Sequence, residues 1–199
     1  MANVLQPFGF QPTGTVSGAT PNFRLSRRLI ASTYTTAIFS GDVVSNVSGS
    51  ASGYLQLYAA TTTAVAGVFM GCKYLSTSQG RTVWSPYYPG SDAAADVTAY
   101  VIDNPDATFM VQVNYTSALG LSAIQQNVTV VAGSPVGSTY SGRSTEGVGA
   151  AATTNTYPFT VVDLVQQPTG SNGTDITTPY NYVIVTFNQE SFKVGVTAF

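Results

Sequence analysis

The amino-acid sequence predicts an all-β protein, built as a single β-sandwich or barrel-like domain with long loops and an extended N-terminal arm. Short apolar runs recur along the chain and are separated by Gly, Pro, Ser or Asn, which is typical of strands joined by turns. In residues 108–115, Phe109, Val111 and Val113 fall on one face of a strand, and Gln112 falls on the other. About ten such runs favour a sandwich or a barrel.

The strands are expected where apolar or alternating residues are bounded by turn residues. In chain order they are residues 22–30, 42–47, 54–61, 65–75, 81–88, 97–103, 108–115, 127–133, 157–165 and 181–189. Residues 182–187 carry apolar or aromatic side chains on both faces, so this strand is expected to be central and covered on both sides. One short helical segment is expected within residues 117–127, where Ser117 or Ser122 can cap a turn.

The chain divides into an N-terminal arm, residues 1–22, and one β-rich domain, residues 23–199. The arm is rich in Gly, Pro and Thr, and its Phe8 and Phe10 give it side chains to bury, so it is expected to become ordered against a neighbour. Residues 132–158 show little apolar periodicity and are expected to form a long loop within the domain.

The composition and charge of the chain limit the kinds of partner that it is expected to bind. Only 8% of residues are charged and the net charge is −2, so the surface is largely neutral, which suits a protein inside an assembly. Seven basic residues are too few for the footprint of a nucleic-acid-binding protein, and no apolar stretch approaches the ~18 residues of a membrane helix. Nucleic acid and membrane are therefore not expected partners. The single cysteine, Cys72, is expected to be buried.

Histidine is absent, which removes the commonest general base and metal ligand. Two acid pairs remain, Asp92 with Asp96 and Asp103 with Asp106. The second lies in "DNPD", which turn preferences explain, and a calcium site built from loop carbonyls stays open. Residues 147–152, "GVGAAA", match a dinucleotide fingerprint, but no helix follows, so a flexible loop is expected. The chain is expected to be no enzyme and to hold no cofactor.

Two clusters are candidate contact sites. Arg24, Arg27 and Arg28 are three of the seven basic residues, and they form either a charge-protected strand edge or a docking contact to an acidic partner. A second cluster, Trp84, Tyr87 and Tyr88, is either core, an oligomer seam or a platform for stacking sugars. The candidate contacts with a partner or with another subunit are Phe8, Phe10, Arg24, Arg27 and Arg28.

Six segments, taken in order, resemble the small structural proteins of tailed bacteriophages that decorate the capsid, often called cement proteins. These segments are residues 2–12, 38–44, 67–75, 103–113, 161–168 and 182–189. The resemblance implies a β-rich trimer on the capsid exterior that clamps adjacent copies of the major capsid protein, made in the cytoplasm of the bacterial host. The alternative is a receptor- or carbohydrate-binding β-module of a tail fibre or adhesin.

Overall fold

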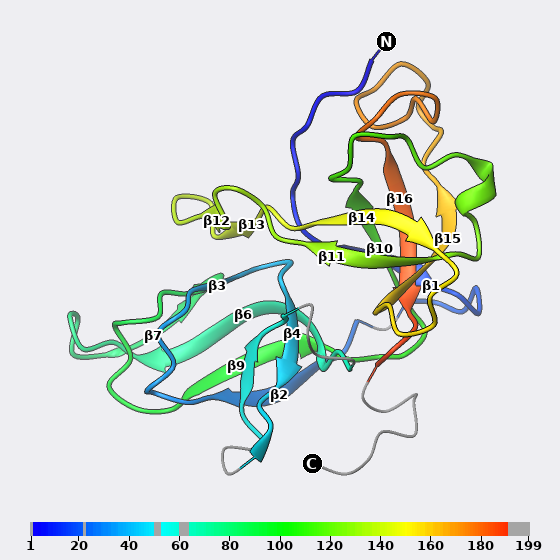
Figure 1. The fold of residues 1–199 in the computed structure, drawn as a ribbon. Helices are drawn as coiled ribbons and strands as arrows, with labels where there is room; N and C mark the ends of the chain where they lie inside the picture. Colours follow the sequence, from blue (N-terminus) through cyan, green and yellow to red (C-terminus); the bar gives the residue numbers. More distant parts are fainter. Residues whose placement is uncertain (1, 22, 50–52, 60–63, 191–199) are drawn as a thin grey trace.

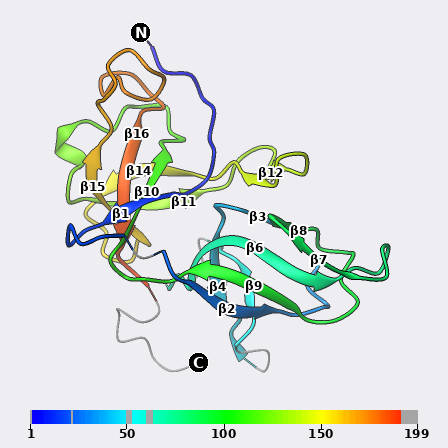
Figure 2. The same cartoon turned by 180° about the vertical axis from the view of Figure 1, so that it is seen from behind.

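The computed structural model describes residues 2–21, 23–49, 53–59 and 64–190, and in them it confirms the all-β class. Two large antiparallel sheets form two lobes, which Figures 1 and 2 show from opposite sides. The first sheet has the strand order β1 (Gln11–Thr15), β10 (Ala107–Gln112), β16 (Tyr182–Phe187), β15 (Phe159–Leu164), β11 (Asn127–Val131) and β14 (Gly147–Ala152). As expected, β16 is central.

The second sheet is built from the part of the chain between β1 and β10. Its order is β2 (Leu25–Ile30), β9 (Val97–Ile102), β6 (Gly67–Leu75), β4 (Val43–Asn46) and β5 (Leu55–Leu57), with β7 (Thr82–Ser85) also paired to β6. Two short pairs complete the fold: β3 (Ile38–Phe39) with β8 (Tyr87–Tyr88), and β12 (Gly137–Ser138) with β13 (Arg143–Ser144). The expected helical segment is a single 3-10 turn, η2 (Leu121–Ala123).

Both sheets curl toward closure, as small barrels do. In the first sheet, a parallel bridge joins Val113, just after β10, to Val148 of β14, and the amide of Asn114 donates to the carbonyl of Val148 at 2.8 Å. In the second sheet, Leu29 of β2 bridges Tyr54, just before β5. Curling covers the sheet edges near these bridges, which limits unwanted pairing with other chains there.

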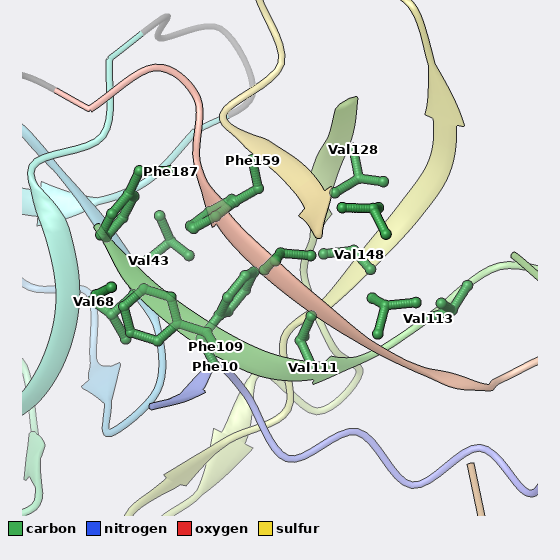
Figure 3. Packing of buried hydrophobic residues seen from close by; sticks show 14 of the residues in the cluster. Phe10, Val43, Val68, Phe109, Val111, Val113, Val128, Val148, Phe159 and Phe187 are labelled. Atoms are coloured by element: carbon green, nitrogen blue, oxygen red, sulfur yellow. The ribbon is translucent and has the colours of Figure 1, made fainter. Parts of the chain in front are cut away.

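Successive side chains on strands of the second sheet belong to two different cores. Val43 of β4 and Val68 of β6 belong to the core of the first sheet, whereas their neighbours Val44 and Phe69 belong to the core of the second. Figure 3 shows Val43 and Val68 beside the aromatic side chains of the first core. The two lobes therefore share apolar packing, since one face of the second sheet covers an end of the first core.

The N-terminal segment was expected to become ordered against a neighbour, but it packs on its own chain. Phe10 is 0% exposed and stacks on Phe159 with ring centroids 4.6 Å apart, and the following strand β1 pairs with β10. Phe8 is half-buried and meets Tyr182 edge to face at 5.1 Å. Of the expected arm, residues 1–22, the described part therefore contains edge strand β1, Gln11–Thr15, and the preceding residues Phe8 and Phe10 pack against the same lobe. Residues 191–199 of the expected domain lie outside the described residues.

Residues 132–158 are also more ordered than the sequence suggested. They contain β12, β13 and β14, and "GVGAAA" is strand β14 and not a flexible loop. Gly and Ala are poor strand formers on average, which hid this strand. Small residues are needed here because there is no room for a larger side chain. A Cβ on Gly147 would lie 2.8 Å from the carbonyl oxygen of Gln112. Small residues let β14 approach β10 and close the first sheet.

Candidate functional site

The candidate site is a groove of about 650 Å³ along β2, which we call the β2 groove. Its lining residues are Arg24, Leu25, Ser26, Arg27, Arg28, Asp103, Asn104 and Pro105. All three clustered arginines of the sequence therefore lie at one place. Arg24, Leu25 and Arg27 are exposed, and Arg28 is half-buried. The strand alternation expected from the sequence places Arg24 and Arg28 on one face and Arg27 on the other.

Asp103 organises one end of the β2 groove. Its Oδ2 lies 3.3 Å from the guanidinium Nη2 of Arg28, and its Oδ1 accepts a hydrogen bond of 2.7 Å from the hydroxyl of Ser26. The Asp103 side chain is 15% exposed and that of Arg28 28%, so the ion pair is partly shielded from water. This pair fixes Arg28, and Arg24 and Arg27 make no ion pair with a described residue.

The turn after Asp103 is structural. The amide of Ala107 donates to the carbonyl of Asn104 at 2.9 Å, and the amide of Asp106 donates to the side-chain oxygen of Asn104 at 3.1 Å. Asn104 therefore starts the turn, and Pro105 holds the second position, where its fixed φ is favoured. The turn therefore begins at the second residue of "DNPD" and not at Asp103. Asp103 is left to pair with Arg28, and Asp106 is exposed.

The three aromatic residues of the second candidate cluster do not form one platform. Tyr88 is fully buried, and its hydroxyl donates to the carbonyl of Tyr34. Tyr87 stacks on Phe39 with ring centroids 5.4 Å apart. Trp84 is separate and 63% exposed. The cluster is therefore mainly core, and Trp84 alone offers an exposed ring.

Sequence reasoning missed a buried carboxyl pair where the two lobes meet. Asp42 and Glu146 are 0% and 2% exposed. An Asp42 oxygen accepts from the amide of Phe39 at 2.7 Å, and a Glu146 oxygen accepts from the amide of Val43 at 2.8 Å. The other oxygen of Asp42, Oδ1, is buried and has no hydrogen-bond donor among the described residues. Glu146 thus ties the β13–β14 segment to the second sheet.

Burial is the main cause of the raised pKa values of Asp42 and Glu146. Loss of hydration raises the pKa of Asp42 to about 6, against the weaker opposing effects of the Phe39 amide and nearby Ser144. The pKa of Glu146 lies well above its ordinary value, first because of burial and then because of the charge on Asp42. At least one proton is therefore retained by the pair in acidic solution. Neither carboxyl is accessible to a substrate.

The N-terminal segment passes directly over this joint. The amide of Gly9 donates to the carbonyl of Glu146 at 3.2 Å, and the amide of Phe10 donates to the carbonyl of Gly41 at 2.9 Å. Gly9 has φ of 75°, and a Cβ there would lie 2.6 Å from the Cβ of Ser144. Only glycine fits this crossing without strain. The segment thereby locks both lobes together.

The described residues offer few other groups for catalysis or metal binding. Cys72 is buried, as expected, and burial raises the pKa of its thiol to about 12, so it is not a reactive thiolate at neutral pH. No group of three or more His, Cys, Asp or Glu side chains suited to a metal ion occurs among the described residues. Within the same residues, no helix is both long and apolar enough to cross a membrane.

The comparisons with known proteins add no relative to this picture. The chain matches no protein-family model, no curated protein and no solved structure. The site must therefore be interpreted from its own geometry, and the geometry singles out the β2 groove as the exposed, charged and partly preorganised surface.

Proposed function

We propose that this chain is a structural virion protein that binds the outer surface of a bacteriophage capsid and stabilises the shell by clamping adjacent capsid subunits. The observation that carries the proposal is the β2 groove, where Arg24 and Arg27 are exposed beside Leu25 on a chain with only 8% charged residues. Cations concentrated beside an exposed apolar side chain suit a docking contact with an acidic protein surface. The major capsid protein is the partner in this proposal.

Exposed apolar side chains support a role inside an assembly. They are spread over both lobes and include Val4, Leu5, Val16, Leu25, Leu29, Leu75, Trp84, Tyr115, Leu121, Val136 and Tyr140. Tyr140, at the tip of the β12–β13 hairpin, is completely exposed. A nearly neutral surface carrying such side chains favours association over free existence in solution. A homotrimer is the form proposed for the assembled protein.

In the proposed mechanism, the protein stabilises the shell by adding contacts between capsid subunits. A trimer that spans the junction between capsid subunits adds interface that must break before the shell can open. Each protomer needs only about 800 Å² of contact per side for a standard interface. Three contacts held in one trimer act together, because release of one leaves the other two to restore it.

The proposed role is binding without catalysis and without a cofactor. The chain contains no histidine, and its unusual carboxyl pair, Asp42 and Glu146, is buried away from any substrate. The thiol of Cys72 is buried as well. These facts favour a binding and structural role over an enzyme.

A carbohydrate- or receptor-binding module of a tail fibre or adhesin is the second candidate, and one observation favours it. Trp84 is 63% exposed and lies opposite Lys73 in the β6–β7 ladder. An exposed indole beside a hydrogen-bond donor can stack on a sugar ring. The surface has no second exposed ring from Tyr87 or Tyr88, which is why we place this function second.

Cosedimentation with capsids tests the proposal. Purified protein is mixed with undecorated capsids and pelleted, and binding that saturates with capsid subunits is expected. Light scattering of the free protein is expected to give a trimer or larger species, and a stable monomer at micromolar concentration would contradict the trimer. A glycan array is run in parallel. Binding to a glycan with no binding to capsids would replace the first function with the second.

A further inference from the structure

We propose that the β2 groove binds an extended acidic segment of the partner protein, which adds to the edge of β2 as a further strand of the second sheet. The inference rests on the proposed function only for the identity of the partner, the capsid. The mode of binding and the chemistry of the segment come from the groove itself.

The groove runs along β2 and continues past its start, where Asp103, Asn104 and Pro105 follow the paired strand β9. Its lining includes Arg24, which directly precedes β2, and the consecutive strand residues Leu25–Arg28. Successive side chains of a strand point to opposite faces, so a groove on one face would be lined by alternate residues only. A groove that touches each residue in turn runs along the backbone. Five residues of strand span about 17 Å, which fits a short extended peptide.

This edge is open for pairing. In the second sheet β2 is the terminal strand, and β9 is its only strand partner among the described strands. The curl of the sheet brings β5 near the other side of β2, and among the described residues the two sides are bridged at Leu29 and Tyr54. No backbone hydrogen bond links residues 24–27 to any described residue outside the β2–β9 ladder. In such a ladder alternate residues direct their N–H and C=O groups outward, where an incoming strand can pair with them.

Charge selects an acidic segment. Three arginines and Asp103 give the groove a formal charge of +2, on a chain whose net charge is −2. Arg28 is paired with Asp103, which leaves Arg24 and Arg27 on opposite faces of the strand as the exposed cations. An incoming strand with acidic residues on both of its faces would meet one arginine on each side. Opposite charges that lie across from each other on neighbouring strands favour pairing.

Protection of the edge is the competing explanation for the same arginines. Charged side chains on an edge strand often prevent pairing with other chains. The two explanations differ in what they exclude: a protective edge repels every added strand, whereas a docking edge repels basic strands and accepts acidic ones. A peptide assay therefore separates them.

The test uses the whole protein and three fluorescent peptides, each long enough to span the groove. The first, called the Thr/Glu peptide, repeats Thr-Thr-Glu-Glu, which places Glu on both faces of an extended strand. The second repeats Thr-Thr-Lys-Lys, and the third is the Thr/Glu peptide with N-methyl groups on consecutive backbone nitrogens, which blocks both of its edges. Fluorescence anisotropy at low salt is expected to show binding of the Thr/Glu peptide only. N-methylation removes backbone donors and is expected to weaken binding about tenfold or more. Equal binding of the methylated peptide would overturn strand addition.

Variants of the protein complete the test. The double variant Arg24→Ala with Arg27→Ala is expected to weaken Thr/Glu binding about fivefold to tenfold at low salt. Arg81→Ala, which removes another exposed arginine outside the groove, is the matched control and is expected to have no effect. An equal loss in the control, or absence of Thr/Glu binding to the unaltered protein, would overturn the inference. Peptide binding without capsid binding would contradict the proposed function and leave the groove assignment standing.

Discussion

The two lobes differ in the packing of their cores and in the side chains that they expose. The first sheet encloses a core in which Phe10, Phe109, Phe159 and Phe187 pack ring against ring, and the N-terminal segment extends it with strand β1. The second sheet has a core with fewer rings, and it carries the exposed arginines at its terminal strand β2. The larger aromatic core therefore lies in one lobe and the candidate contact in the other. Changes in the two lobes should separate folding from binding.

The largest effect is expected from the aromatic core of the first lobe. Phe10→Ala should destabilise the protein by about 3–5 kcal/mol, because it leaves a cavity among the other rings. Urea unfolding of the purified variant gives this value. Phe8→Ala is the control, since Phe8 is only half-buried, and a clearly smaller loss is expected. Equal losses would mean that the N-terminal segment does not share the core in solution.

The joint between the lobes should give an unusual dependence of stability on pH. The folded pKa values of Asp42 and Glu146 are raised, so the stabilising contribution of each carboxyl is present below its ordinary pKa near 4 and is lost as pH rises through its raised pKa, which is about 6 for Asp42. For Asp42 this corresponds to on the order of 2–3 kcal/mol. The exposed Asp92, Asp96 and Asp175 have lowered pKa values, and their opposite effect appears only as pH falls below about 4.

Urea unfolding at pH 5 and pH 8 checks this expectation. The unaltered protein should be more stable at pH 5. Asp42→Asn keeps an oxygen for the Phe39 amide but cannot ionise, so it should remove much of the difference between the two pH values. Asp163→Asn, at an exposed position, should leave the difference unchanged. A protein that is more stable at pH 8 would show that the pair is not buried in solution.

A smaller effect is expected at the end of the β2 groove. Asp103→Asn removes the charge that faces Arg28 but keeps an acceptor for Ser26, and it should cost about 1 kcal/mol. Asp106→Asn, in the same turn but exposed, should change stability by less than about 0.5 kcal/mol. Thermal unfolding compares the two variants. A larger loss for Asp106→Asn would contradict the assignment of Asp103 as the structural acid.

Much of the fold could be predicted because the hydrophobic pattern is local. The alternation in residues 108–115 and the apolar run in residues 182–187 identify β10 and β16, which lie side by side in the first sheet. Five strands were missed, and three of them, β3, β12 and β13, have only two residues each. The other two, β1 and β14, consist of Gly, Pro, Thr and Ala in large part, and their strand form depends on pairing with β10 and β11. Such tertiary dependence leaves little trace in a local pattern.

The candidate site could be predicted only in part for the same reason. Arg24, Arg27 and Arg28 are neighbours in sequence, so their clustering was visible, and their ion-pair partner Asp103 was singled out for its turn. The pair Asp42 and Glu146 was not visible, because its members lie in separate turn-rich segments and each looks like an ordinary surface acid. Phe10 was taken as a contact, but its burial depends on how the N-terminal segment folds back.

The most direct test of the account measures capsid binding and stability on the same variants. Arg24→Ala with Arg27→Ala is compared with Arg81→Ala by cosedimentation with undecorated capsids at low and high salt, together with urea unfolding of each protein. We expect the double variant to bind several-fold more weakly, with a flatter salt dependence and stability within about 0.5 kcal/mol of the unaltered protein. Unchanged capsid affinity in a folded double variant would contradict the claim that the second lobe carries the contact.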